Sequence, residues 1–137
     1  MAGLAYRLWK AGNWAYRHKL PLLPGLFCRL NRVINSCDIP SKTQIGKNVA
    51  FKHNGLGVVI NEYSVIGDDC VIYQNVTLAG KNKQRPHLGK GVIVGAGAVL
   101  IGGVYLADNV KVGANAVVTH DVPEGKTVVG IPAEVID

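Results

Sequence analysis

Residues 88–123 read LGKGVI VGAGAV LIGGVY LADNVK VGANAV VTHDVP, and one six-residue pattern runs through all of these blocks. Each block begins with leucine or valine and carries a small apolar residue four places later. An α-helix repeats its apolar positions about every 3.6 residues and a flat strand every 2, so neither explains a period of six. A short fixed period of this kind predicts a β-solenoid, in which each block forms a short strand and a corner.

The same rhythm extends back to Ile39 and predicts a register for the whole solenoid. Three blocks close one triangular coil, so the leading aliphatic residues fall on three faces. Face A is expected to hold Ile39, Ile60, Leu78, Leu100 and Val118, face B Ile45, Ile66, Leu88 and Leu106, and face C Phe51, Ile72, Val94 and Val112. Residues 54–58 and 80–87 interrupt the rhythm, and we expect loops there, at the C-to-A corner and the A-to-B corner.

The N-terminal segment has a helical pattern instead. Leu4, Leu8 and Trp9 fall on one helical face, and Phe27, Leu30, Val33 and Ile34 fall on one face of a second segment. Pro21 and Pro24 separate the two. The sequence therefore predicts a mainly β fold in two domains, a short helical cap over residues 1–36 and a β-helix over residues 37–137.

The composition indicates a folded protein without a membrane span. The chain has 137 residues, of which 48% are hydrophobic, so disorder is excluded. No apolar run approaches the ~20 residues of a transmembrane helix, and we expect no signal peptide. The three cysteines lack CxxC spacing and indicate thiols in a reducing compartment, so we expect a cytoplasmic protein.

The formal charge of +6 is concentrated near the N-terminus, because Asp38 is the first acidic residue of the chain. A second basic cluster, KNKQRPH, occupies residues 81–87. Such clusters fit a phosphate-bearing partner or an anionic membrane, and we expect weak peripheral membrane contact through the cap. We expect no nucleic-acid partner, because no nucleic-acid-binding motif appears in the sequence.

One acidic residue and one histidine meet in the predicted first coil. Asp38 begins face A and His53 ends face C, so the coil brings both to one corner, about one rung apart. An Asp–His pair fixes the imidazole tautomer and favours proton abstraction, which makes His53 and Asp38 the candidate catalytic residues.

A column of residues continues from His53 along face C. Gln74, Ala96 and Ala114 each follow the leading aliphatic by two places, as His53 does. The alanines would leave the backbone open to a long, thin ligand. Ordinary solenoid packing also favours alanine there.

Four stretches resemble the hexapeptide-repeat acyltransferases, and within them the serine O-acetyltransferases. They are CDIPSKTQIGKNVAFKHNGLGVVI, IYQNVTLAGK, VGAGAVLIGG and VGANAVVTHDVP…VVGIPAEVI, and they span nearly everything from Cys37 onward. The resemblance implies a left-handed parallel β-helix and an enzyme that uses acetyl-CoA as co-substrate and no metal. It also implies a homotrimer with active sites between subunits. Whether two such trimers join into a hexamer stays open.

The resemblance also assigns roles to individual residues. It implies that His53 is the general base and that Asp38 is its partner. It places Gly80, Ala96, Lys111 and Ala114 along the acetyl-CoA groove.

The sequence departs from the family pattern at positions that bind the acetyl acceptor in serine acetyltransferases. Lys52 stands before His53 where serine acetyltransferases have an aspartate that holds the serine ammonium. The loop reads Gln84, Arg85, Pro86, His87 where the family has Arg-His-Pro, so either Arg85 or His87 replaces the second histidine. The helical domain that supplies a further aspartate in the family has no counterpart in this sequence. The candidate substrate-binding residues are Lys52, Gln74, Arg85 and His87.

These departures favour a sugar hydroxyl, of a surface polysaccharide or its precursor, as the acetyl acceptor. The short cap followed by HNGLGVVI also resembles serine-acetyltransferase-like proteins found with polysaccharide synthesis. Serine O-acetylation in cysteine biosynthesis is the alternative, and a catalytically silent β-helical scaffold or binding subunit is the second. A metal-dependent carbonic anhydrase is disfavoured, because His18, His53, His87 and His120 do not pair on one face.

Overall fold

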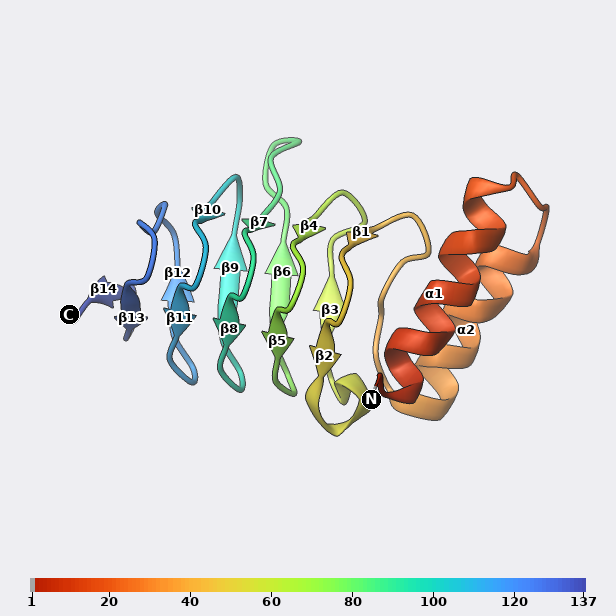
Figure 1. Ribbon diagram of the computed structural model, residues 1–137, viewed down its shortest axis with the longest axis horizontal. Coiled ribbons are helices and arrows are strands. Elements are labelled where there is room, and N and C mark those ends of the chain that lie inside the picture. The colour runs from red at the N-terminus through yellow and green to blue at the C-terminus, as the bar shows by residue number, and fades with distance from the viewer. Residues whose placement is uncertain (1) are drawn as a thin grey trace.

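The computed structural model describes residues 2–137 and has two helices followed by a stack of short strands (Figure 1). The helices are α1 (Leu4–Arg17) and α2 (Leu23–Asn35), and a short 3₁₀ helix, η1, spans Lys52–Gly55. Neither α-helix in this described part of the chain combines the length and the apolar character that crossing a bilayer requires.

Fourteen short strands follow, each two or three residues long. They are β1 (Gln44–Ile45), β2 (Ala50–Phe51), β3 (Val59–Ile60), β4 (Val65–Ile66), β5 (Val71–Ile72), β6 (Thr77–Ala79), β7 (His87–Leu88), β8 (Ile93–Val94), β9 (Val99–Ile101), β10 (Tyr105–Leu106), β11 (Lys111–Val112), β12 (Val117–Val118), β13 (Thr127–Val129) and β14 (Glu134–Val135).

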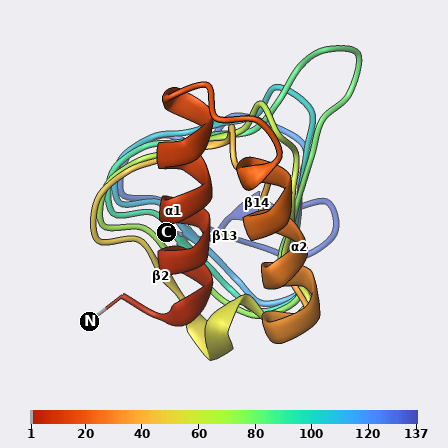
Figure 2. The ribbon, with the colours of Figure 1, turned by 90° about the vertical axis from the view of Figure 1, so that its right-hand side faces the viewer.

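The strands form three sheets, one for each face of a triangular solenoid of about four coils (Figure 2). Sheet A has the order β12-β9-β6-β3, sheet B the order β1-β4-β7-β10, and sheet C the order β14-β13-β11-β8-β5-β2. Pairing is parallel except between β13 and β14. In sheet C, Ile72 pairs with Phe51 on one side and with Val94 on the other. Sheets A and B show the same stacking, which confirms the predicted three faces.

The corners depend on left-handed backbone at the turns. Asn75, Asn109 and Asn115 have φ angles of 59°, 61° and 57°. Asparagine adopts this region at lower cost than most residues, because its short polar side chain bonds locally. The recurrence of asparagine near the corners thus follows from the tight bends.

The leading aliphatic residues fill the interior. Leu88, Leu100 and Leu106 are fully buried. Helix α1 extends the same core over the first coil, where Trp9 joins one continuous cluster with Phe51. The Tyr6 hydroxyl donates a hydrogen bond of 2.9 Å to a backbone oxygen of that coil. The division into separate domains at residues 36 and 37 stays a prediction.

Helix α2 differs from the sequence prediction. Asn31 and Asn35 are buried, whereas Val33 and Ile34 of the predicted apolar face are 81% and 55% exposed. The reason is a polar contact between the helices: Asn31 Nδ2 donates to the Ala5 carbonyl at 3.0 Å, and Asn35 Nδ2 donates to Asn31 Oδ1 at 2.8 Å. Buried amides with partners are tolerated, so Val33 and Ile34 are left outward, whereas Phe27 and Leu30 of the predicted face are half-buried.

Replacing Leu100 by alanine tests the role of the stacked aliphatics. Leu100→Ala should lower the free energy of unfolding by about 2–5 kcal/mol, because it leaves a cavity in a close-packed interior. Leu26→Ala, at a site that is 48% exposed, is the matched control and should change stability little. Urea denaturation measures both. Equal effects of the two substitutions would contradict this account of the core.

Candidate active site

The corner between sheets C and A carries His53 in an unusual backbone conformation. His53 and Asn54 lie in η1 with φ angles of 54° and 52°, in the left-handed region. Non-glycine residues pay a strain cost there, and such residues cluster at functional sites. Asn54 Oδ1 accepts a hydrogen bond of 2.9 Å from the Leu4 backbone N–H, which ties the turn to α1. The turn presents the His53 side chain to solvent.

Asp38 begins the sheet A side of the first coil, beside Val59. Its carboxylate is held by helix α2: Arg32 lies 3.2 Å from Oδ2, and the Cys28 thiol donates to Oδ1 at 3.8 Å. Among the hydrogen bonds within residues 2–137, none joins Asp38 to His53. The catalytic pairing of these two residues stays a prediction.

Sequence reasoning missed Arg32 and Cys28. The available signal was their spacing of four residues, which puts them on one face of a helix that ends just before Asp38. Helical spacing says that two residues share a face, but the target of that face depends on how the helix packs.

The predicted column on face C is present for Gln74, Ala96 and Ala114. Under Gln74, however, the first coil places Leu56 and not His53, because the Asn75 N–H donates to the Leu56 carbonyl at 2.8 Å. The paired positions Ile72, Val94 and Val112 place Gln74, Ala96 and Ala114 two residues beyond in successive coils. The backbone N–H of Gly97 donates to the Gln74 carbonyl at 3.0 Å, and that of Asn115 donates to the Ala96 carbonyl at 2.8 Å. Ala114 is exposed and Ala96 half-buried, so only small side chains line this edge of the upper coils.

Gln74 is the polar member of this column. Its Oε1 atom is buried and has no hydrogen-bond partner in the described part of the chain. Buried polar atoms normally have partners, so an orphaned acceptor needs an explanation. Gln74 lies one coil above His53, where a bound donor group could satisfy it.

The corner between sheets A and B carries the long loop, which projects beyond the other corners (Figures 1 and 2). Gly80 opens this loop. A Cβ atom there would lie 2.6 Å from Asn61 Nδ2 and 3.0 Å from the Gln84 carbonyl oxygen, so no larger residue fits without movement. Gly80 and Arg85 border one small hollow of about 250 Å³.

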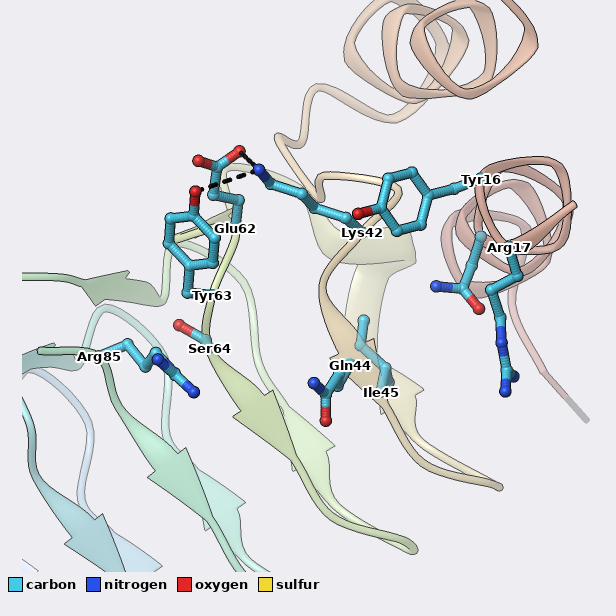
Figure 3. A pocket seen from close by; sticks show the side chains of 10 residues that line it. Tyr16, Arg17, Lys42, Gln44, Ile45, Glu62, Tyr63, Ser64 and Arg85 are labelled. Atoms are coloured by element: carbon cyan, nitrogen blue, oxygen red, sulfur yellow. Dashed lines mark hydrogen bonds and ion pairs between the residues drawn. The ribbon is translucent and has the colours of Figure 1, made fainter. Parts of the chain in front are cut away.

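Arg85 also borders a larger pocket of about 560 Å³ between the loop and the end of α1 (Figure 3). The pocket is lined by Asn13, Tyr16, Arg17, Lys42, Gln44, Ile45, Glu62, Tyr63, Ser64 and Arg85. Lys42 is engaged there, at 3.0 Å from the Glu62 carboxylate and 3.3 Å from the Tyr63 hydroxyl. Arg17 and Arg85 remain as cations of the pocket without an ion pair within residues 2–137.

The other candidate residues are exposed. The His87 ring lies 5.0 Å from the Tyr105 ring on sheet B. Lys52 directly precedes His53, and Lys111 lies on the outer side of sheet C, three residues before Ala114. In the part of the chain that the structure describes, no group of three or more His, Cys, Asp or Glu side chains could hold a metal ion.

The candidate residues therefore divide between two corners of the triangle. One group lies at or directly before the C-to-A corner: Lys52, His53, Gln74, Ala96 and Ala114. Gly80, Arg85 and His87 lie at the A-to-B corner, across the width of sheet A (Figure 2). A single chain does not bring the two groups together.

The three cysteines are free thiols of different accessibility. Burial raises the pKa of Cys37 to about 12 and that of Cys70 to about 11. Burial, and next the Asp38 carboxylate, also raise the pKa of Cys28, which is only half-buried. The thiolate is the reactive form, so all three thiols should react slowly near neutral pH.

Alkylation should follow this order. At pH 8.5, iodoacetamide should modify Cys28 first, and Cys37 and Cys70 at least about tenfold more slowly, because their thiolate fractions are small and the side chains are buried. Peptide mass spectrometry over time measures the three rates, with the denatured protein as control. Faster modification of Cys37 than of Cys28 would contradict the described burial.

Comparison with known proteins gives consistent matches. A family profile described as "Bacterial transferase hexapeptide (six repeats)" matches residues 85–120. The chain is 42% identical over 137 residues to a serine acetyltransferase of Helicobacter pylori, covering 97% of this chain and 78% of the relative. It is 42% identical over 131 residues to that of Synechococcus elongatus, covering 93% of this chain and 53% of the relative.

Solved structures of serine acetyltransferases superpose closely on this chain. A serine acetyltransferase in complex with CoA superposes with a TM-score of 0.91 at 32% identity, over 96% of this chain and 56% of that one. Soybean serine acetyltransferase complexed with serine gives 0.91 at 34%, over 97% of this chain and 56% of that one. The chain thus spans about half the length of these structures. The match confirms the predicted left-handed parallel β-helix.

The prediction that the acceptor is a sugar of a surface polysaccharide is wrong, because these relatives and solved structures are serine acetyltransferases. The prediction relied on the missing carboxylates, on the altered loop, on the short cap and on repulsion between Lys52 and an ammonium. In the structure Lys52 is exposed, and water and salt screen a solvated charge. One exposed lysine is therefore a weak argument against an amino-acid acceptor.

Proposed function

The chain belongs to the serine acetyltransferase family of hexapeptide-repeat transferases, and from that premise we propose that it transfers the acetyl group of acetyl-CoA to the serine hydroxyl. The observation that carries the proposal is the position of His53. The residue lies in a left-handed, exposed turn at the C-to-A corner, in the coil below the column of Gln74, Ala96 and Ala114. An imidazole held in this way can reach a bound hydroxyl, and it is the commonest general base at neutral pH.

In the proposed reaction His53 takes the proton from the serine hydroxyl. The oxygen attacks the thioester carbonyl, the bond from carbonyl carbon to sulfur breaks, and the CoA sulfur leaves with the proton from His53. Asp38 serves as the orienting partner of His53, which requires its carboxylate to exchange at least part of its contact with Arg32. Arg32 therefore competes with His53 for the same carboxylate.

Acetyl-CoA is proposed to lie along the column. Ala96 and Ala114 leave backbone groups accessible beside the coils, and Lys111 lies on the same face for a phosphate of the nucleotide. Gln74 Oε1, which is buried and unpartnered, is suited to accept a hydrogen bond from the serine ammonium. It would partly replace the carboxylate for which Lys52 is substituted.

The separation of the two corners supports a homotrimer with active sites between subunits. In a trimer the A-to-B corner of one subunit can meet the C-to-A corner of the next, which adds Gly80, Arg85 and His87 to the site. The outward residues of sheet A suit an interface, because Val59 is 45% exposed and Val99, Ile101 and Val117 are half-buried. We also propose a cytoplasmic location, in line with three free thiols.

The experiment that tests the function measures release of free CoA thiol from acetyl-CoA with serine and with a panel of sugars and nucleotide sugars. Serine should support turnover with a KM within ~1 μM–1 mM, the ordinary range for enzymes. Thiol release with another acceptor and none with serine would overturn the proposal. Light scattering of the same sample measures the number of subunits.

Removal of the proposed base should abolish most turnover. His53→Ala should lower kcat by about 10²–10⁴-fold while leaving the affinity for CoA nearly unchanged, because the imidazole acts on the acceptor proton. His120→Ala, at another exposed histidine, is the matched control and should keep wild-type kcat. Steady-state kinetics and CoA titration measure the two effects. A His53→Ala enzyme with wild-type kcat would refute the assignment.

The orienting carboxylate should matter less than the base. Asp38→Asn should lower kcat by a smaller factor than His53→Ala, since the imidazole remains present but is less well oriented. The KM for acetyl-CoA and the melting temperature should stay close to those of the wild type. An Asp38→Asn enzyme with unchanged kcat would leave Asp38 a purely structural residue paired with Arg32.

A further inference from the structure

The helical cap forms one end of the molecule. Helices α1 and α2 lie side by side across the end of the solenoid, so each has one side against the first coil and one side facing outward (Figure 2). On α1 the inward side is marked by the buried residues Ala5, Trp9 and Gly12. The outward sides have no partner within residues 2–137.

The outward side of α2 is largely aliphatic. Leu26, Arg29 and Val33 follow at intervals of three and four residues, which makes one stripe along the helix, and Leu22 directly precedes the helix as its N-cap residue. Leu22 is 89% exposed and Val33 81%. Asn31 and Asn35, on the opposite side, are buried. A helix usually buries its aliphatic residues and exposes its polar ones. Helix α2 instead buries two asparagines and exposes Leu26 and Val33, while Phe27 and Leu30 are half-buried.

The outward side of α1 adds an aromatic residue and two cations. Arg7, Lys10 and Trp14 are spaced at helical intervals and are exposed, with Trp14 at 56%. We call the outward residues Arg7, Lys10, Trp14, Leu22, Leu26, Arg29 and Val33 the cap face. Tryptophan, leucine and arginine side by side are the composition of segments that lie in a membrane interface.

The net positive charge of the molecule comes from this end. Residues 1–37 contain six cations, Arg7, Lys10, Arg17, Lys19, Arg29 and Arg32, and no acidic residue. The remaining residues contain nine cations and nine acidic residues and are formally neutral. The net charge of +6 therefore belongs entirely to the cap, and only Arg32 of its cations is in an ion pair within residues 2–137.

We propose that the cap face binds the surface of an anionic membrane. The aliphatic stripe and Trp14 enter the boundary between headgroups and acyl chains, while Lys10 and Arg29 contact lipid phosphates. A neutral partner would explain the exposed aliphatic residues but not the one-sided charge, whereas an anionic lipid surface matches both. The membrane would then lie next to the first coil, which carries Asp38 and His53.

Co-sedimentation with lipid vesicles tests the proposal on the whole chain. The protein should pellet with vesicles of phosphatidylcholine containing about one third phosphatidylglycerol, and remain in the supernatant with phosphatidylcholine alone. Binding should weaken steeply between low and high salt, because exposed charges are screened. Each basic residue at such a surface strengthens binding about fivefold, so Lys10→Gln with Arg29→Gln should weaken it about 25-fold.

Matched variants separate the cap face from general effects. Lys90→Gln with Lys126→Gln removes the same charge from the solenoid, and Ile136→Ser removes an exposed aliphatic residue near the C-terminus; both should bind vesicles like the wild type. Leu22→Ser with Val33→Ser should weaken binding at least about tenfold, because it removes the apolar part. All these positions are exposed, so circular dichroism should show unchanged folding.

The outcomes decide between occupants of the cap face. Failure to pellet with phosphatidylglycerol vesicles, or equal binding by the Lys10/Arg29 variant and its control, would overturn the proposal. A second result would also overturn it: the wild type binds no lipid, and the Leu22/Val33 variant has half the particle mass of the wild type. The cap face would then be a contact between copies of the chain. Thiol release with serine is measured separately, so failure of lipid binding leaves the proposed activity standing.

Discussion

Stacking of equivalent aliphatic residues in successive coils is the constraint on which the rest of the structure depends. Each strand is only two or three residues long, too short to be stable alone, and is held by backbone hydrogen bonds to the strands above and below. A shift of one residue would turn Leu88 or Leu100 outward, so burial fixes the register. Once the register is fixed, Gln74, Ala96 and Ala114 must form a column at the C-to-A corner, and the inserted turn of the first coil carries His53 below that column.

Local regularity explains what could be predicted from the sequence. The three faces, both loops and the column of Gln74, Ala96 and Ala114 follow from counting in blocks of six, because each block repeats the same contacts. Counting also placed His53 directly under Gln74, whereas the inserted loop puts Leu56 there. The side of α2 that faces inward could not be predicted in this way. The outcome there depends on the bond from Asn31 to the Ala5 carbonyl, which exists only after the two helices have packed.

In the candidate site, too, the repeat predicts some positions, whereas others depend on tertiary packing. The sequence places Asp38 and His53 near one corner, but the described partner of Asp38 is Arg32, from a helix whose direction the repeat does not determine. The acceptor was predicted wrongly because departures at a few positions were given too much weight, among them the charge of Lys52, which is exposed and therefore screened. Arg85 and Gly80 were assigned correctly to the long loop, yet that loop lies at a different corner from His53. A complete site from these residues needs a second subunit, which one chain cannot show.

The central claim is that the column on face C is the acetyl-CoA groove. Calorimetric titration with CoA tests it directly on two variants, Ala114→Trp in the column and Ala107→Trp directly after β10, at the B-to-C corner and outside the column. Ala114 is exposed, so a large side chain should block the groove without disturbing the fold. The account predicts that Ala114→Trp weakens CoA binding by at least about tenfold, about 1.4 kcal/mol, and that Ala107→Trp binds like the wild type. Wild-type affinity in Ala114→Trp would contradict it.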